Sequence, residues 1–380
     1  MPEVAFARRT AELLAPADVR IGGGRPWDLV VHDDAFHRRV LSGASLALGE
    51  SYLDGWWDCE RLDEFFHRVL RAGLDRRLAT PGGLLTALRA RLGNPQAPAR
   101  AFRIGERHYD LGNELYRSML DARMIYSCGY WASAATLDEA QEAKLERIGR
   151  KLDLAPGMRV LDLGCGWGGT AQFLAERHGV EVVGITVSRG QAEWARAACR
   201  GLPVEIRLQD YRELDGTYDR ILSVGMFEHV GPRNYPTFFA IARRCLRADG
   251  LFLLHTIGGE RSVARTDPWI EKYIFPDSVL PSARQITAAL EGRFVLEDWE
   301  SFGADYDRTL LCWFRNFDAA WPRLCDRYDP RFYRMWKYYL LSCAGAFRAR
   351  RNQVWQLVLS PLGVAGGWGR PAGGAPDVRD

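Results

Sequence analysis

The sequence lacks long apolar runs, paired-cysteine motifs and a strong excess of either charge. No stretch approaches the roughly 20 consecutive apolar residues that a membrane-spanning helix requires. The N-terminal segment MPEVAFARRTAELL has no uninterrupted apolar core of the kind found in secretory signals. We therefore expect a cytoplasmic protein that contacts membranes only from their surface.

The eight cysteines show neither a C-x-x-C pair nor regular spacing. Because zinc sites and disulfide frameworks both depend on such spacing, we expect reduced thiols and no metal site. Lys and Arg number 51 against 48 Asp and Glu, so the net charge of +3 argues against a nucleic-acid partner held by overall charge. Residues 71–107 are an exception, with eight arginines and two acidic residues, and form either a solvated face or a contact for anionic lipid head groups.

A chain of 380 residues exceeds one ordinary domain, so we expect two. Residues 1–92 have a mainly helical pattern and form the smaller, N-terminal domain. Gly and Pro concentrate in GNPQAPAR, which begins a linker at 93–107. The catalytic domain then spans 108–360, and we expect the Gly- and Pro-rich segment 361–380 to be disordered.

The larger domain alternates strand-like and helical segments after a helix at 137–152. The expected strands are RVLDL, EVVGI, VEIRLQ, DRILSV and GLFLLHTI, with helices at 170–178, 188–200 and 235–247 between them. Later strands are expected at RFVLEDWE and NQVWQLVLS, with helices at 308–325 and 330–349. This order predicts an α/β fold, with a parallel sheet covered by helices on both faces and a ligand crevice at the carboxyl ends of the strands.

A glycine-rich turn follows the first of these strands. In RVLDLGCGWGG, Asp162 precedes Gly164, Gly166 and Gly168, and a helix follows. The spacing departs from the G-x-G-x-x-G pattern of dinucleotide sites and suits S-adenosylmethionine (SAM) better, although a purely structural glycine turn stays open. We therefore predict a class I SAM-dependent methyltransferase fold of Rossmann-like architecture.

Polar residues at the next two strand ends are candidates for binding the rest of SAM. Thr186, Ser188 and Gln191 follow the second strand, where the Gln amide can bond both ribose hydroxyls and Ser188 can equally be a helix N-cap. After the third strand, Asp210 can accept from the adenine amino group and Tyr211 can pack on the ring. A surface turn is the alternative for these two.

A second set of polar residues is expected above the same edge of the sheet. Residues 108–131 precede the core, where a lid or substrate wall would lie, and include Cys128, which alone is more typical of a buried small side chain. Glu228 with its neighbour His229, His255 and Tyr306 fall at or near the crevice. Any one of them can be structural, but their convergence is less readily explained by packing.

Nine segments together resemble those of the cyclopropane-fatty-acyl-phospholipid synthase family. They are LALGESYLDGWW, HYDLGN, YSCGYW, VLDLGCGWGG, VGMFEHVGPRNY, LLHTIG, DPWIEKYIFP, FGADYD and CAGAFRAR. The resemblance that they carry extends over nearly all of residues 30–358. The first segment favours the bacterial phospholipid enzymes over the mycolic-acid cyclopropane synthases, which are similar only in the catalytic part.

The resemblance implies transfer of a methylene from SAM across the cis double bond of an unsaturated phospholipid acyl chain. The π bond attacks the SAM methyl, and the resulting carbocation loses a proton to close the ring. Such a site should exclude water and present aromatic faces. The aromatic residues that suit this demand, although core packing can explain most of them, are Tyr126, Tyr130, Trp131, Phe227 and Tyr306.

The resemblance also implies a bound bicarbonate as the base. Glu228, His255 and Tyr306 would hold it, with backbone groups of Cys128 and Ile257. We expect one enclosed, water-excluding cavity to join these residues to the glycine turn.

Further implications of the resemblance are cofactor contacts at Tyr126 and Ser127, peripheral membrane contact through the first domain, and a homodimer. Cys343 matches a position sometimes assigned as an active-site cysteine, but the reaction has no covalent enzyme step, which favours a packed thiol. The alternatives are a SAM-dependent methyltransferase that forms methyl-branched lipid or methylates a small amine, and a non-catalytic lipid-binding module.

Overall fold

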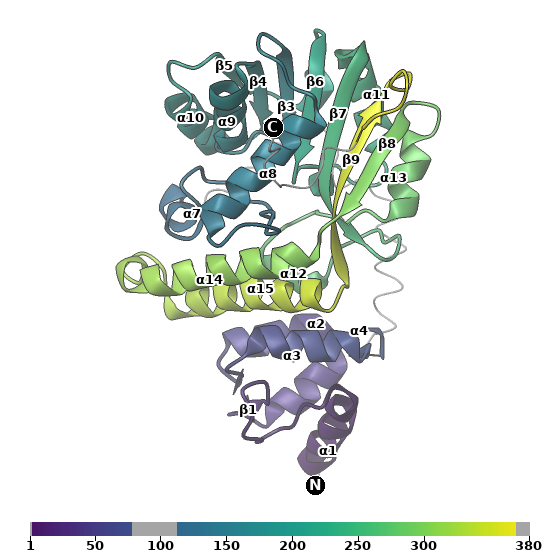
Figure 1. The fold of residues 1–380 in the computed structure, drawn as a ribbon. Helices are drawn as coiled ribbons and strands as arrows, with labels where there is room; N and C mark the ends of the chain where they lie inside the picture. Colours follow the sequence, from purple (N-terminus) through teal and green to yellow (C-terminus); the bar gives the residue numbers. More distant parts are fainter. Residues whose placement is uncertain (1, 78–111, 370–380) are drawn as a thin grey trace, which may run out of the picture.

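The computed structural model describes residues 2–77 and 112–369 (Figure 1). A seven-stranded sheet carries helices on both faces. The paired helices α14 (Ala304–Leu324) and α15 (Pro330–Arg348) lie between this sheet and the N-terminal helices. The central sheet confirms the predicted α/β class.

The strand order is β5-β4-β3-β6-β7-β9-β8. The strands are β3 (Arg159–Leu163), β4 (Glu181–Thr186), β5 (Val204–Leu208), β6 (Tyr218–Val224), β7 (Leu246–Gly259), β8 (Val295–Ser301) and β9 (Asn352–Ser360). Strands β3 to β7 pair in parallel, as predicted, whereas β9 runs antiparallel to both β7 and β8. The chain order reverses between β3 and β6, which is where open α/β sheets bind ligands.

The helices from α7 to α13 in the larger unit are α7 (Asn113–Met119), α8 (Leu137–Lys151), α9 (Gly169–His178), α10 (Arg189–Ala198), α11 (Tyr235–Cys245), α12 (Pro268–Tyr273) and α13 (Ala283–Leu290). Four of these seven helices, namely α8, α10, α12 and α13, begin after a residue whose side chain caps them. Thr136 and Glu139 form a capping box at the start of α8. Ser188 caps α10 by accepting from the Gln191 amide at 3.3 Å. The expected helices at 137–152, 170–178, 188–200 and 235–247 are confirmed, with ends that shift by at most two residues.

Helices dominate the N-terminal residues 2–77. They are α1 (Pro2–Leu14), α2 (Ala35–Leu53), α3 (Leu62–Arg71) and α4 (Leu74–Arg77), beside a small sheet of β1 (Val30–Val31) and β2 (Trp57–Asp58). Helix α2 packs closely on α12, because a Cβ on Gly49 would lie only 2.3 Å from the Trp269 ring. The Arg348 guanidinium of α15 pairs with Asp63 of α3 at 2.8 Å. The proposed linker at 93–107 and the boundary at 92 lie outside the described residues.

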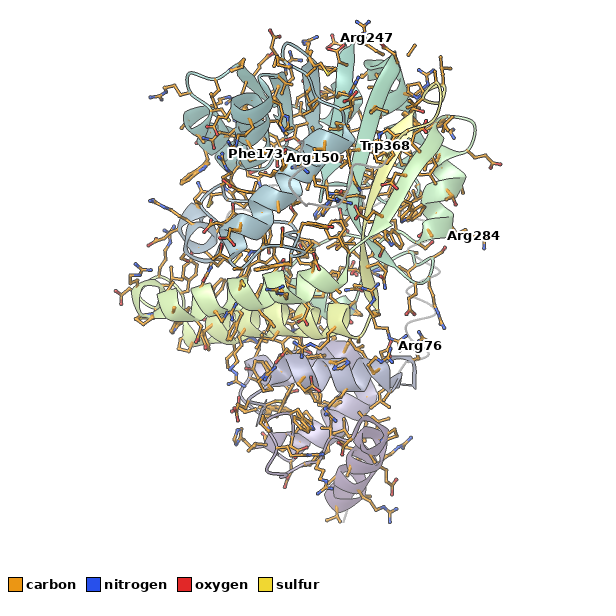
Figure 2. All side chains as sticks on the ribbon, viewed as in Figure 1. Arg76, Arg150, Phe173, Arg247, Arg284 and Trp368 are labelled. Carbon is orange, nitrogen blue, oxygen red and sulfur yellow. The ribbon has the colours of Figure 1, made fainter. Side chains whose placement is uncertain are left out.

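The chain remains packed for some distance beyond β9. The Trp368 indole, labelled in Figure 2, donates to the Lys151 carbonyl at 3.2 Å and packs with Val364 against the core beneath α8 and α9. Residues 361–369 are therefore ordered, contrary to the expected disorder of the whole 361–380 segment, because an aromatic side chain anchors them. Residues 370–380 lie outside the described part.

Candidate active site

The glycine turn after β3 forms one wall of a pocket at the carboxyl edge of the sheet. Gly164 and Gly166 have φ angles of +88° and +55°, and a Cβ on Gly166 would meet nothing within 4 Å. These glycines let a ligand approach the backbone. The predicted residues that line the pocket are Tyr126, Ser127, Asp162, Gly164, Gly166, Thr186, Ser188, Gln191, Asp210 and Tyr211.

Gly168 lies at the end of the glycine turn, where α9 packs against α10. It is not among the residues that line this pocket. With φ +85°, it precedes α9, and a Cβ there would lie 2.9 Å from the Ala195 Cβ of α10. Gly168 therefore permits close packing of two helices.

Two polar clusters shape the far side of the pocket. The Thr186 hydroxyl donates to Gln191 Oε1 at 3.0 Å, which fixes the amide so that its NH₂ group remains to donate to a ligand. Asp210 accepts from the Arg212 amide at 2.9 Å and from its guanidinium at 2.8 Å. Asp210 is only 5% exposed, which contradicts the surface-turn alternative, and it lines the pocket while paired with Arg212.

Several lining residues were not predicted from the sequence. Trp167, Gln209, Gly225 and Met226 are among them. His229, singled out only as the neighbour of Glu228, also lines the pocket, and burial lowers its pKa to about 4, so its ring is neutral near pH 7. Gly225 and Met226 directly follow β6, so the rule that ligands bind at strand ends could have identified them.

Glu228 lies beside this pocket in a short 3₁₀ turn, η4 (Phe227–His229). Its Oε1 accepts from the Ile257 amide of β7 at 2.6 Å. Its Oε2 is buried and has no hydrogen-bond partner among the described residues. Burial raises the pKa of this carboxyl to about 7, so it carries a proton for much of the time near neutral pH.

His255 and Cys128, two further residues of the expected base site, are both buried. His255 of β7 contacts Gln356 Nε2 through Nδ1 at 3.3 Å, and burial lowers its pKa well below the usual value. Cys128 is fully buried, donates its S–H to the Gly129 carbonyl at 3.2 Å, and has a pKa raised by burial. Burial likewise raises the pKa of Cys343, on α15, to about 12. These shifts favour the neutral thiol form of both cysteines near pH 7, which disfavours a nucleophilic thiolate.

Aromatic rings form a continuous wall from the pocket to Tyr306. The Tyr126 ring, which lines the pocket, lies 5.1 Å from the Trp313 ring, and Trp313 lies 5.7 Å from Tyr306. The Tyr126 hydroxyl also contacts the Tyr339 hydroxyl at 2.8 Å. A second contact joins the rings of His229 and Phe275 at 5.8 Å.

Among residues 2–77 and 112–369, the pocket beside the glycine turn does not extend to the expected base site. The pocket lining includes Tyr126 and His229 but not Glu228, His255 or Tyr306. The Glu228 carboxyl is held toward Ile257, and the rings of Tyr126 and Trp313 pack between the glycine turn and Tyr306. The two groups of residues are neighbours that share an aromatic wall.

Solved structures with the same fold identify the class. The chain is similar to the cyclopropane synthase MmaA2 from Mycobacterium tuberculosis, with a TM-score of 0.64 and 31% identity over 68% of this chain and 97% of that one. It is also similar to the mycolic acid cyclopropane synthase CmaA1 complexed with SAH and CTAB, with a TM-score of 0.63 and 34% identity over 68% and 97% of the two chains. Together with the glycine turn, these matches define a SAM-dependent methyltransferase fold.

Sequence comparison then gives the family. A family model described as mycolic acid cyclopropane synthetase matches residues 96–357, and the chain belongs to this family. It is 54% identical over 363 residues to the cyclopropane-fatty-acyl-phospholipid synthase of Escherichia coli strain K12, covering 95% of this chain and 94% of that protein. Identity to cyclopropane mycolic acid synthase 1 of M. tuberculosis strain H37Rv is 36% over 260 residues, or 63% of this chain and 91% of that protein. The resemblance found in the sequence is therefore confirmed, including its extension into the N-terminal part.

Proposed function

We propose that this protein is a cyclopropane-fatty-acyl-phospholipid synthase. It transfers a methylene from SAM across the cis double bond of an unsaturated phospholipid acyl chain. The observation that carries this proposal is the 54% identity to the E. coli synthase across 95% of the chain. The shorter mycolic-acid relatives do not share the N-terminal part to that extent.

The pocket supplies groups for each part of SAM. Gly164 and Gly166 allow the nucleoside to lie against the backbone, and the Gln191 NH₂ group points to hydroxyl recognition. Asp210 and Tyr211 line the same pocket, and we propose that they bind the adenine ring. The N-terminus of α9 adds amide dipoles that favour an anionic group.

The aromatic wall suits the electrophilic chemistry of the reaction. An alkene is a weak nucleophile, and the cation formed by methyl transfer reacts readily with water. Tyr126 lines the pocket, and the rings of Trp313 and Phe275 pack against it. Aromatic rings of this kind exclude water and interact favourably with positive charge. We propose that the acyl double bond lies along these rings during methyl transfer.

We also propose that bicarbonate binds beside this wall, where it would supply the acceptor for the proton that leaves the new methyl group. The unpartnered Glu228 Oε2 fits such a group, because a protonated carboxyl donates a hydrogen bond to an anion. His255 is neutral and offers a ring N–H, and Tyr306 offers a hydroxyl. The Ile257 amide already donates to Glu228, so in this proposal it orients the carboxyl. Cys128 contributes backbone groups and no thiolate.

Membrane contact and assembly are further parts of the proposal. Among the described residues, none of the helices has the length and apolar character to span a bilayer. Because the substrate chains lie in a bilayer, we propose a cytoplasmic enzyme that binds the membrane surface, with the arginines of residues 71–107 as contacts. The resemblance to the family supports a homodimer, which light scattering after gel filtration tests.

The experiment uses the purified full chain, SAM and vesicles of cis-monounsaturated phospholipid, with and without bicarbonate. Cyclopropane-containing acyl chains, formed faster with bicarbonate, are expected, and the ring is identified by its strongly shielded protons in NMR. Formation of methyl-branched chains would instead favour the alternative methyltransferase. Absence of any modified lipid, with SAM binding retained, would contradict the proposal.

A further inference from the structure

A buried lysine lies directly behind the pocket wall. Lys144 of α8 is 0% exposed, and its ammonium donates to the Ser127 hydroxyl at 2.8 Å. Ser127 is 6% exposed and lines the pocket. Helix α8 thus places a positive charge behind Ser127, separated from the pocket by this one side chain.

This contact determines which hydrogen bond the Ser127 hydroxyl can still make. An ammonium group has only donors, so the Ser127 oxygen must act as its acceptor. No acceptor for the Ser127 hydroxyl proton occurs among residues 2–77 and 112–369. Ser127 therefore offers an O–H donor to the pocket, which fits a ligand group that only accepts hydrogen bonds.

A neighbouring side chain of the same helix fixes the backbone at this position. Gln141, which is 0% exposed, donates through Nε2 to the Ser127 carbonyl at 2.8 Å. Gln141 and Lys144 lie three residues apart and therefore face the same side of α8. Together they hold both the backbone and the hydroxyl of Ser127.

The Asp162 carboxyl interacts electrostatically with Lys144, which supports a role for this lysine beyond packing. Asp162 is 1% exposed, lines the pocket and has a buried Oδ2 without a hydrogen-bond partner among the described residues. A zwitterionic amino-acid group, which has one acceptor-only end and one donor end, would complement a Ser127 donor and an Asp162 acceptor. SAM carries such a group next to its sulfonium.

We infer that Lys144 is a positioning residue that directs the Ser127 hydroxyl toward the carboxylate of the SAM amino-acid moiety. The inference rests on the proposed function. It adds a residue that does not line the pocket and acts on the ligand only through Ser127. Its effect should therefore depend on the ligand carboxylate and on the presence of the Ser127 hydroxyl.

The test measures binding by calorimetry with two probes, S-adenosylhomocysteine and 5′-methylthioadenosine, which lacks the amino-acid moiety. Lys144→Met should weaken S-adenosylhomocysteine about tenfold to a hundredfold, the loss expected for a charge-assisted hydrogen bond. Its affinity for 5′-methylthioadenosine should stay within about twofold of the original protein. Both titrations are repeated with added bicarbonate, to test whether the Ser127 hydroxyl binds a free anion instead of the ligand carboxylate. The difference between the two probes in their loss of affinity should persist.

Three further variants distinguish positioning from a structural effect. In Lys144→Met/Ser127→Ala, affinity for S-adenosylhomocysteine should equal that of Ser127→Ala alone, because the lysine acts through the serine. Lys151→Met is the matched control, since Lys151 is also 0% exposed on α8 but pairs with Glu300 at 2.6 Å, away from the pocket. It should lower the melting temperature and leave affinity for S-adenosylhomocysteine unchanged.

Equal loss of both probes in Lys144→Met, or additive losses in the double variant, would overturn the inference. Unchanged S-adenosylhomocysteine affinity in Lys144→Met would also overturn it and leave the proposed function intact. Failure of the unmodified protein to bind S-adenosylhomocysteine would instead contradict the proposed function itself. If Lys151→Met does not fold, the comparison of the two probes in Lys144→Met still decides the matter.

Discussion

The Ile257 amide donates to the Glu228 carboxyl at 2.6 Å and so joins the turn after β6 to strand β7. One carboxyl oxygen is occupied by this bond, while the other is buried without a partner among the described residues. The arrangement fixes a protonatable group beside the SAM pocket without placing it inside. A residue held in this way can orient a base near the substrate and have little effect on the methyl donor.

The first prediction concerns Glu228→Gln. Its amide oxygen can keep the bond from Ile257, but its NH₂ group cannot exchange a proton with an anion. We expect kcat for cyclopropanation to fall about a hundredfold or more. The dissociation constant of S-adenosylhomocysteine should change by less than about threefold. A comparable loss of affinity for S-adenosylhomocysteine would contradict the assigned role.

The second prediction uses the same variant to test the pKa of Glu228. Burial raises this pKa from 4.5 to about 7, so the folded state binds more protons than the unfolded state between these values. The stabilisation is complete below the unfolded pKa and is lost as pH rises through the folded pKa. Relative to Glu228→Gln, the unmodified protein should lose about 3 kcal/mol of unfolding free energy between about pH 4 and pH 8.

Denaturant unfolding of both proteins across this range measures the difference. The buried residues His229 and His255 have lowered pKa values and change stability in the opposite direction, but they are present in both proteins and largely cancel. A difference independent of pH would show that folding leaves the pKa of Glu228 unchanged.

The third prediction tests the packing role of Gly168. Gly168→Ala places a Cβ 2.9 Å from that of Ala195 at a positive φ, so we expect a loss of about 1–3 kcal/mol in unfolding free energy. Gly190→Ala in α10 is the control, because its Cβ would meet nothing within 4 Å. It should be neutral or slightly stabilising. Equal melting temperatures for the two variants would refute the packing role of Gly168.

The fourth prediction concerns Cys343. Because its thiol has a pKa of about 12 and the proposed reaction has no covalent enzyme step, Cys343→Ala should retain kcat within about threefold. Steady-state assays on vesicles provide the measurement. Complete loss of activity in a variant with an unchanged melting temperature would show that the thiol takes part in the chemistry.

The fifth prediction concerns the basic segment. Reversing the charge of Arg89, Arg91 and Arg100 should weaken binding to anionic vesicles, since each basic residue near such a surface contributes about 1 kcal/mol. Sedimentation with vesicles measures it. Reversing three exposed arginines of the larger unit should have less effect and serves as the control set: Arg200, Arg247 and Arg284. Unchanged sedimentation of the first variant would refute the contact.

Much of the fold could be predicted because the local signals agree. Val160 and Leu161 belong to a short apolar run that only a buried strand accommodates well, and Gly164 follows where the chain must turn. The antiparallel direction of β9 could not be predicted, because strand pairing depends on where α14 and α15 return the chain. The contact of Trp368 with Lys151 could not be predicted either, because Trp368 lies in a Gly- and Pro-rich segment whose composition is typical of disorder.

The site was only partly predictable for a related reason. Thr186 and Gln191 follow a strand, so their approach to the crevice follows from topology. Lys144 and Gln141 lie on an amphipathic helix, where polar residues normally face solvent. Their burial depends on the loop that carries Ser127, a tertiary contact without a local sequence signal.

The account depends most on closure of a three-membered ring after methyl transfer from SAM. The decisive measurement supplies SAM with a trideuterated methyl group and cis-monounsaturated phospholipid vesicles, and counts deuterium in the new carbon of the product by mass spectrometry and NMR. Ring closure removes one methyl deuteron, so a cyclopropane that retains two is expected. A methyl branch that retains all three would contradict the account.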